Sequence, residues 1–298
     1  MSVPASYLYV PGDAEKRLRG ASARGAHALI ADLEDAVSPD RKDLARRIVA
    51  AWLAAGGGEE PRADHVIARD SVKNWVRVNP GEPGLEDIEA VWGPRLHGVC
   101  LAKAESASGV AKAAQLLEKL EGPNPVRRVV LMPLIESATA LRALREIASA
   151  PRVGILHLGE IDLATDLSIE PDDDGTELLC ARSKLVVESR ASRIAAPVGG
   201  IHSRLGDPGG LGRTTRQLRR LGFGARAVIH PEQIETVNAV FAPTRDELVA
   251  AKELVRRYEE SSRLGQGVYR DEGGRMVDEA VARSARTLLD QHENRVVE

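Results

Sequence analysis

Residues 129–162 read VVLMPLIESATALRALREIASAPRVGILHLGEID, and this stretch decides the fold. Two short apolar runs, Val129–Leu134 and Gly154–Leu158, flank a longer segment, Ala138–Ala148, in which apolar residues recur with helical spacing. Both runs are almost continuously apolar, which is typical of parallel strands that are buried on both faces. The stretch therefore predicts a strand–helix–strand unit with parallel strands.

The same alternation continues in both directions from this unit. Six further strands are expected at Tyr7–Val10, Ala28–Leu33, Trp75–Val78, Gly98–Ala102, Ala196–Gly199 and Ala227–Ile229. The helices expected between strands include Lys42–Ala55, Ala107–Leu120 and Thr176–Ile194. Eight units favour closure into a (β/α)₈ barrel, the TIM-barrel fold of the α/β class. An open doubly wound sheet would carry a GxGxxG turn, which neither Gly56–Gly58 nor Gly209–Gly210 provides.

A helical extension, residues 243–298, follows the expected barrel of residues 1–242. Pro243–Arg263 reads as a charged helix with Thr244 as its N-cap, and Asp278–Asn294 reads as a last helix. The Gly-rich segment Gly265–Gly274 separates them. This arm exceeds what a closed barrel needs. It packs on its own barrel or reaches across to a neighbouring subunit, and the pattern does not decide between these two arrangements.

Composition and charge exclude several classes of protein. The 298 residues are 43% hydrophobic, enough for a sizeable core, and a net charge of −3 provides no basic field for nucleic acid. Neither a signal peptide nor an apolar run of membrane-spanning length is visible, so we expect a cytoplasmic protein. Cys100 and Cys180 lie in apolar stretches and are expected in the core. Gly56–Asn74 is expected to be a surface excursion.

Polar side chains follow most of the expected strands at their carboxyl ends, where barrels of this kind carry their active sites. The residues concerned are Asp32, Glu34, Asp35, Arg77, Asn79, Lys103, Glu136, Glu160, Asp162 and His230. Apolar strands that end so regularly in charged groups predict a polar site at one rim of the barrel.

Glu136 and Asp162 are candidate ligands for a divalent cation. They follow adjacent strands, and Mg²⁺ is commonly held by one or two carboxylates together with water and substrate oxygens. No His/Cys group has the spacing of a zinc site. A metal here would chelate a 2-oxo acid or its hydroxy counterpart and polarise the carbonyl group. The guanidinium of Arg77 suits a substrate carboxylate.

Several of these residues also have a purely structural interpretation, which the spacing leaves open. Glu34 and Asp35 are then ion-pair partners of nearby cations in the barrel mouth. The same interpretation assigns structural roles to Glu160 and Asp166, as helix-start residues favoured by the helix dipole, and to His157 and His230.

Six motifs recur in an order that resembles a known family. They are Tyr7–Gly12 (YLYVPG), Asp32–Val37 (DLEDAV) with Lys42 and Ala45–Arg46 behind it, Val76–Asn79 (VRVN), Leu134–Ser137 (LIES), Gly159–Leu167, and Val228–Ile234 (VIHPEQI). From residue 6 to about residue 290 the chain resembles the citrate lyase β-subunit-like family of the HpcH/HpaI aldolase superfamily. Malyl-CoA and citramalyl-CoA lyases belong to the same group. Any one of these motifs alone is weak evidence for the family, whereas the six in this order are specific to it.

The resemblance implies a barrel that associates through its C-terminal arm into a homo-oligomer, with a homotrimer favoured. It implies Mg²⁺ at Glu136 and Asp162, and the carboxylate or carbonyl end of the substrate at Arg77. Asp278, after Met276–Val277, matches an acid/base that is carried to the next subunit's site. The catalytic candidates are therefore Asp278, Arg77, Glu34 and Asp35, and the substrate-binding candidates are Arg77, Lys103, Pro11, Gly12 and His230.

Four positions depart from the family pattern. Ala5 stands where relatives often have arginine, Ala102 replaces a usual proline, and Ser168 replaces a usual glycine. Strand seven ends in Gly199-Gly200, where relatives tend to have an aspartate. The metal pair and Arg77 are retained, so the departures bear on which substrate is bound.

The resulting expectation is a Mg²⁺-dependent carbon–carbon lyase, or the reverse Claisen or aldol condensation, on a 3-hydroxyacyl thioester such as malyl-CoA or citramalyl-CoA. An acyl-CoA and a 2-oxo acid would be its small-molecule partners, and thioester hydrolysis after condensation is a variant. One alternative is a citrate lyase β-subunit acting on a citryl thioester of an acyl carrier protein. Another, of a different class, is a barrel that binds acyl-CoA or an oxo acid without turnover.

Overall fold

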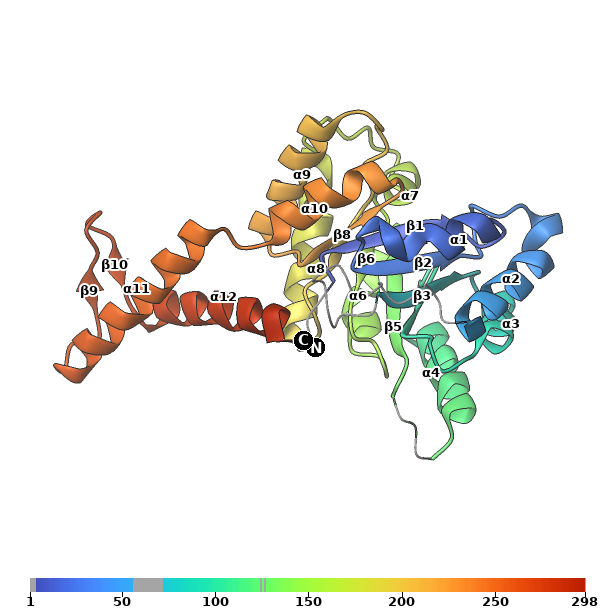
Figure 1. Cartoon of the computed structure of the whole chain (residues 1–298), viewed down its shortest axis with the longest axis horizontal. Helices are drawn as coiled ribbons and strands as arrows, with labels where there is room; N and C mark the ends of the chain where they lie inside the picture. Colours follow the sequence, from blue (N-terminus) through green and yellow to red (C-terminus); the bar gives the residue numbers. More distant parts are fainter. Residues whose placement is uncertain (1–3, 56–71, 124, 126, 298) are drawn as a thin grey trace. The chain divides into compact units, whose positions relative to one another are not determined.

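Eight parallel strands close into a barrel in the computed structural model, which describes residues 4–55, 72–123, 125 and 127–297. The strands are β1 (Ser6–Pro11), β2 (Ala28–Asp32), β3 (Lys73–Val78), β4 (Gly98–Leu101), β5 (Val130–Ile135), β6 (His157–Leu158), β7 (Val198–Gly199) and β8 (Ala225–Val228). β1 pairs with both β2 and β8, which closes the ring (Figure 1). The expected (β/α)₈ fold is confirmed. Of the expected excursion at Gly56–Asn74, residues 56–71 lie outside the described residues, and the last two belong to β3.

Helices follow each strand along the chain and lie outside the barrel (Figure 1). They are α1 (Glu15–Ala21), α2 (Lys42–Ala55), α3 (Glu82–Val91), α4 (Ala107–Glu121), α5 (Ala138–Arg142), α6 (Leu144–Ala148), α7 (Glu160–Asp166), α8 (Leu179–Ala191), α9 (Pro208–Leu221) and α10 (Ile234–Phe241). The expected helix Ala138–Ala148 is divided into α5 and α6, because Ala143 leaves helical geometry at φ −88° and ψ 11°. The expected helix Thr176–Ile194 begins with a 3₁₀ turn, Thr176–Leu178, and ends at Ala191.

Side chains alternate along each strand between the lumen of the barrel and the layer beneath the helices. In β5, Met132 and Leu134 belong to the buried cluster inside the barrel, whereas Leu131 and Ile135 pack in the outer cluster. The same period of two directs the next inward position, Glu136, towards the lumen. The strand that builds the core therefore also delivers a carboxylate to the mouth of the barrel.

Trp75 on β3 is the largest side chain in the cluster inside the barrel. Its ring meets the Tyr7 ring edge-on, with centroids 5.8 Å apart. A Cβ atom at Gly98, on the neighbouring strand β4, would lie 2.2 Å from the indole ring. Glycine is therefore required at this position so that the lumen can hold the indole ring.

The chain divides into two compact units, Val3–Phe241 and a second unit that includes Ala242–Glu298. The second unit contains α11 (Arg245–Arg263), the short strands β9 (Tyr269–Arg270) and β10 (Met276–Val277), and α12 (Glu279–Val297). The expected N-cap Thr244 is confirmed, since its hydroxyl accepts the backbone N–H of Glu247 at 3.1 Å. The Gly-rich break contains β9 and leads into an antiparallel hairpin with β10.

The two cysteines differ in their surroundings. Cys100 is fully buried inside the barrel, as expected, but Cys180 is exposed. The expectation for Cys180 is wrong because the helical period of α8 turns it outward beside Leu179, which is 46% exposed, while Ala181 packs inward. Within the described ranges, no helix combines the length and the apolar character that a membrane crossing requires.

Candidate active site

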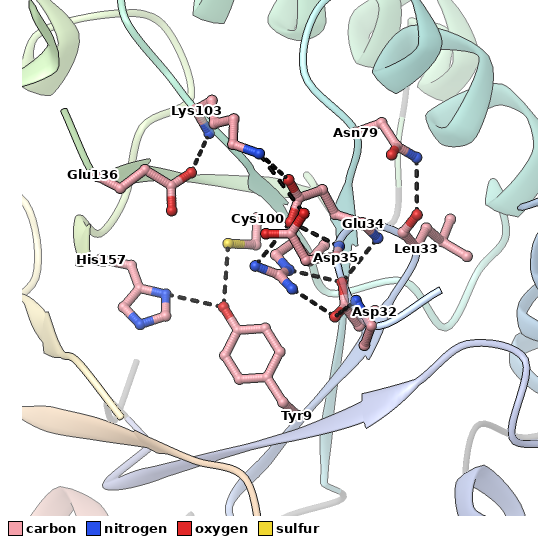
Figure 2. A network of polar contacts seen from close by, with 12 residues as sticks. Tyr9, Asp32, Leu33, Glu34, Asp35, Asn79, Cys100, Lys103, Glu136 and His157 are labelled. Atoms are coloured by element: carbon pink, nitrogen blue, oxygen red, sulfur yellow. Dashed lines mark hydrogen bonds and ion pairs between the residues drawn. The ribbon is translucent and has the colours of Figure 1, made fainter. Parts of the chain in front are cut away.

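Four charged or polar side chains meet inside the carboxyl end of the barrel, on β2, β3, β6 and directly after β5. They are Asp32, Arg77, His157 and Glu136. Each lies two residues beyond an apolar side chain of the inner cluster, so the alternation that fills the lumen also gathers them. Figure 2 shows this network, with Lys103 reaching from Glu136 towards Glu34.

Arg77 is held by two buried carboxylates. Its Nε and one Nη donate to the two oxygens of Asp32 at 2.7 and 2.6 Å, and the other Nη lies 3.1 Å from Glu34 Oε2. Burial opposes the positive charge, but the hydrogen bonds and charge of Asp32 outweigh it and raise the pKa of Arg77. Within the described residues, these three contacts use three of the five N–H groups of the guanidinium.

Lys103 joins this cluster to Glu136. Its backbone N–H donates to Glu136 Oε1 at 2.6 Å, and its ammonium group donates to Glu34 Oε1 at 2.7 Å. The residue has φ +49°, in the left-handed region, where a non-glycine residue costs of order 1 kcal/mol. This turn directs the N–H and the ammonium group of one residue at two different carboxylates.

Glu136 and Asp162 lie close enough for their charges to interact. Burial is the main cause that raises the pKa of Glu136, to about 7, and the charge of Asp162 raises it further. The hydrogen bond from the Lys103 N–H offsets these effects only in part. A Cβ atom at Gly159 would lie 2.8 Å from Glu136 Oε2, so the chain leading to Asp162 passes directly beside the buried carboxylate.

This carboxylate pair fits a hard divalent cation. The nearby cations, Arg77 and Lys103, are paired with other carboxylates, so the repulsion between Glu136 and Asp162 is not relieved by an ion pair with either of them. In the described part of the chain, no cluster of three or more His, Cys, Asp or Glu residues encloses a metal position. Two carboxylates with room for water and substrate oxygens are the donor set that Mg²⁺ commonly uses.

Tyr9 and His157 lie beside the guanidinium of Arg77 inside the barrel. The Arg77 Cζ is 5.1 Å from the centroid of the Tyr9 ring, and the Tyr9 hydroxyl is 3.3 Å from His157 Nδ1 (Figure 2). Burial, and to a lesser extent Arg77, lowers the pKa of His157 to about 3, while burial raises that of the Tyr9 phenol. Both groups are therefore neutral, and the tautomer of the imidazole sets which of them donates in this hydrogen bond. His157 is buried, in line with its structural interpretation.

His157 is expected to make the protein less stable in acid. In the unfolded chain it binds a proton near pH 6.5, whereas the folded protein excludes that proton down to about pH 3. Its contribution is therefore complete above pH 6.5 and is lost as the pH falls, by about 2 kcal/mol between pH 7 and pH 5. Urea unfolding of the wild type and of His157→Gln at both pH values measures this difference. An equal loss of stability in both proteins would contradict the assignment.

A series of hydrogen bonds from Lys42 and Asn79 holds the loop between β2 and α2. The Lys42 ammonium donates to the carbonyl oxygens of Leu33 and Glu34 at 2.7 and 2.6 Å and to Asn79 Oδ1 at 2.9 Å. The Asn79 amide donates in turn to the Leu33 carbonyl and to the fully buried Asp87. Lys42 and Asp87 were not among the predicted site residues, because their contribution depends on how α2 and α3 pack.

The other predicted rim residues occupy varied positions. Pro11 ends β1, and Asp35 is exposed with a carboxylate oxygen 3.7 Å from Lys103 Nζ. Gly12 donates its N–H to the Asp32 carbonyl at 2.8 Å, and a Cβ atom there would lie 2.7 Å from the same oxygen. The His230 side chain is 42% exposed and accepts a backbone N–H two residues further on.

Two acidic residues have capping roles. Asp278 lies in the second unit, where its Oδ1 accepts the Val281 N–H at 3.0 Å and so caps α12. Asp166 was expected to start a helix, and this is wrong because Asp166 is the last residue of α7. Its carboxylate instead accepts the N–H of Ala138, the first residue of α5, at 2.7 Å.

Known proteins resemble this chain in sequence and in fold. The citrate lyase subunit beta of Leuconostoc mesenteroides subsp. cremoris is 32% identical over 292 residues, covering 95% of this chain and 91% of that protein. A (3S)-malyl-CoA thioesterase of Cereibacter sphaeroides is 31% identical over 264 residues, covering 88% and 86%. The crystal structure of CitE from Mycobacterium tuberculosis in complex with magnesium, acetoacetate and coenzyme A is 27% identical, with a TM-score of 0.75 and 98% of both chains covered.

The family model for HpcH/HpaI aldolase/citrate lyase matches residues 5–231, which span the barrel and its polar rim. The motifs that carry the resemblance in the sequence all begin inside that range. The resemblance is thereby confirmed, and the chain belongs to the HpcH/HpaI aldolase/citrate lyase family.

Proposed function

We propose that the protein is a Mg²⁺-dependent carbon–carbon lyase, or the catalyst of the reverse condensation, for a 3-hydroxyacyl thioester. The observation that carries the proposal is the placement of Glu136 and Asp162 at a barrel mouth where Arg77 also lies. The backbone that leads into α7 and Asp162 passes directly beside Glu136, since a Cβ atom at Gly159 would lie 2.8 Å from Glu136 Oε2. Solved relatives support the choice of ligands, since M. tuberculosis proteins are described with magnesium and either coenzyme A and acetoacetate or oxaloacetate.

Glu136 and Asp162 would hold Mg²⁺, which supplies a Lewis acid for the oxygen atoms of the oxo-acid portion. In the cleavage direction, the C3 hydroxyl loses a proton and the C2–C3 bond breaks. The electron pair of that bond becomes the enolate of the shorter thioester, which takes up a proton at C2, and C3 becomes the carbonyl of a 2-oxo acid. Asp278 is the proposed acid/base for these proton transfers.

Arg77 has the role of binding the carboxylate of the oxo-acid portion. Asp32 and Glu34 fix its guanidinium from one side, so its other N–H groups are oriented before the substrate arrives. Lys103 keeps Glu34 in place and donates a backbone N–H to Glu136. Such fixed donors and charges stabilise the developing alkoxide and enolate without reorganisation in the transition state.

The deciding experiment is a cleavage assay with purified protein and Mg²⁺. Malyl-CoA, citramalyl-CoA and related 3-hydroxyacyl-CoA esters are offered, and release of the shorter acyl-CoA and of the 2-oxo acid is followed with and without EDTA. We expect release from at least one ester, and its loss when EDTA removes the metal. Release that is insensitive to EDTA would overturn the metal-dependent reaction.

Two relatives favour two alternative activities, and the products released in the same assay distinguish them. The similarity to a citrate lyase subunit beta over 95% of the chain favours a thioester on an acyl carrier protein as substrate. The similarity to a (3S)-malyl-CoA thioesterase favours hydrolysis. Release of free CoA and a hydroxy acid identifies the thioesterase. Cleavage of a citryl thioester of a carrier protein, with silence on all CoA esters, identifies the lyase subunit.

A further inference from the structure

An ion pair between the buried Arg182 and the partly buried Glu160 lies beneath the first turn of α7, outside the polar network of the barrel mouth. Arg182 on α8 donates from Nε and one Nη to the two carboxylate oxygens of Glu160, at 2.7 and 3.1 Å. Its other Nη donates to the carbonyl oxygens of Asp174 and Gly175 at 3.2 and 3.1 Å. One side chain thus ties the start of α7 to α8 and to the loop before it.

Glu160 is also confined from the side of β7 and β8. A Cβ atom at Gly200 would lie 2.8 Å from Glu160 Cγ, so the glutamate chain packs directly on the backbone there. The buried Arg226 donates to the Gly200 carbonyl at 2.9 Å, and to the hydroxyls of Thr214 and Thr215 at 2.8 Å each. The glycine is therefore fixed in place, and it closes the space into which the Glu160 side chain would otherwise turn.

The direction of Asp162 follows from that of Glu160. The two residues are separated by two positions on α7, which is about 200° around the helix axis. With Glu160 turned inward to Arg182, Asp162 is exposed on the other side of the helix. Gly159, directly before the helix, would place a Cβ atom 2.8 Å from Glu136 Oε2, so the first turn of α7 starts beside that carboxylate. A rotation of the first turn of α7 would move the Asp162 carboxylate away from the Glu136 carboxylate.

We propose that Arg182, Glu160 and Gly200 position Asp162 for the divalent cation. This inference rests on the metal site of the proposed function and adds three residues that touch neither metal nor substrate. Stability alone is a weak explanation for the ion pair, because the cost of removing two charges from water largely cancels their attraction. Groups that orient metal ligands from behind typically change metal affinity by about 10- to 100-fold.

The chain contains a matched control for a purely structural role. Arg152 pairs with Glu121 through two hydrogen bonds of 2.8 and 2.7 Å. The Arg152 and Glu121 side chains are 12% and 2% exposed, and those of Arg182 and Glu160 are 8% and 11% exposed, so the two pairs are similarly shielded from water. Glu121 ends α4, so this second pair lies at the amino ends of the strands, opposite the carboxylates of the rim.

The test measures Mn²⁺ binding by the full-length protein, without substrate or turnover. Mn²⁺ is a paramagnetic hard cation with the same preference for oxygen ligands as Mg²⁺, so its free concentration can be followed by electron paramagnetic resonance. We expect Arg182→Met and Gly200→Ala to weaken Mn²⁺ binding about tenfold or more. Arg152→Met should remain within about twofold of the wild type while losing comparable thermal stability.

Folded Arg182→Met and Gly200→Ala proteins with wild-type Mn²⁺ affinity would overturn the inference, and so would equal weakening in Arg152→Met. If Arg182→Met does not fold, Gly200→Ala decides, because it removes no charge. A wild type that binds no Mn²⁺ also overturns it. A wild type that binds Mn²⁺ but cleaves no thioester removes only the proposed reaction, and the positioning role then stands or fails on the variants alone.

Discussion

Glu136→Ala is expected to abolish metal-dependent cleavage while the protein stays folded. The variant removes one of two carboxylates at the cation site, so turnover should fall by at least about a thousandfold, because the charge stabilisation of several kcal/mol that a metal supplies is lost. The fold should survive, since burial disfavours the charged form of Glu136, and among the described residues its removal leaves one hydrogen-bond donor, the Lys103 N–H, without its acceptor. Steady-state kinetics, Mn²⁺ binding and thermal unfolding measure the three consequences.

Two further variants separate the causes. Glu136→Gln keeps an acceptor for the Lys103 N–H, so an equal loss of turnover in Glu136→Gln assigns the effect to the missing charge. Glu118→Ala removes an exposed carboxylate on α4 and should behave as the wild type. A folded Glu136→Ala protein with unchanged turnover would contradict the assignment of Glu136 as a ligand of the divalent cation.

The barrel and much of its rim could be predicted because each depends on a local pattern. A short, almost continuously apolar run identifies a strand that is buried on both faces. Because side chains alternate along a strand with a period of two, the first polar residue after the run on the inward face points into the mouth. Asp32, Arg77 and Glu136 all satisfy this rule. Neither long-range packing nor loop geometry is needed to find them, which is why one sequence is enough.

The remaining features depend on contacts between distant parts of the chain. Tyr9 and His157 are 148 positions apart and meet only when the barrel closes. Arg182 reaches Glu160 from another helix, and its own helix shows nothing that marks it as a partner of a carboxylate. Lys103 adopts a left-handed backbone conformation that is usual for glycine, and no glycine at this position indicates it in the sequence. The hydrogen bond from its backbone N–H to Glu136 could therefore not be predicted from the sequence.

Asp278→Asn is expected to lose most activity while keeping substrate affinity and stability. Asp278 caps α12 through its hydrogen bond with the Val281 N–H, and asparagine is an equally good N-cap. The amide cannot transfer protons as the carboxylate does, so kcat should fall about 10²- to 10⁴-fold. Asp278→Ala is less informative, because it also removes the cap at a cost of about 1 kcal/mol. Wild-type kcat in Asp278→Asn would show that the aspartate is only a cap.

Mixed oligomers test whether Asp278 serves the barrel of another subunit. Asp278→Asn chains keep an intact barrel, and Glu136→Gln chains keep an intact arm, so a shared site regains both groups when the two are unfolded and reassembled together. Random assembly should restore about one quarter of wild-type activity, since half of the barrels and half of the arms are intact. Arg77→Ala is a poorer partner than Glu136→Gln, because loss of Arg77 leaves the buried Asp32 and Glu34 without their shared cation. If the mixture remains as inactive as either variant alone, the arm does not act across subunits.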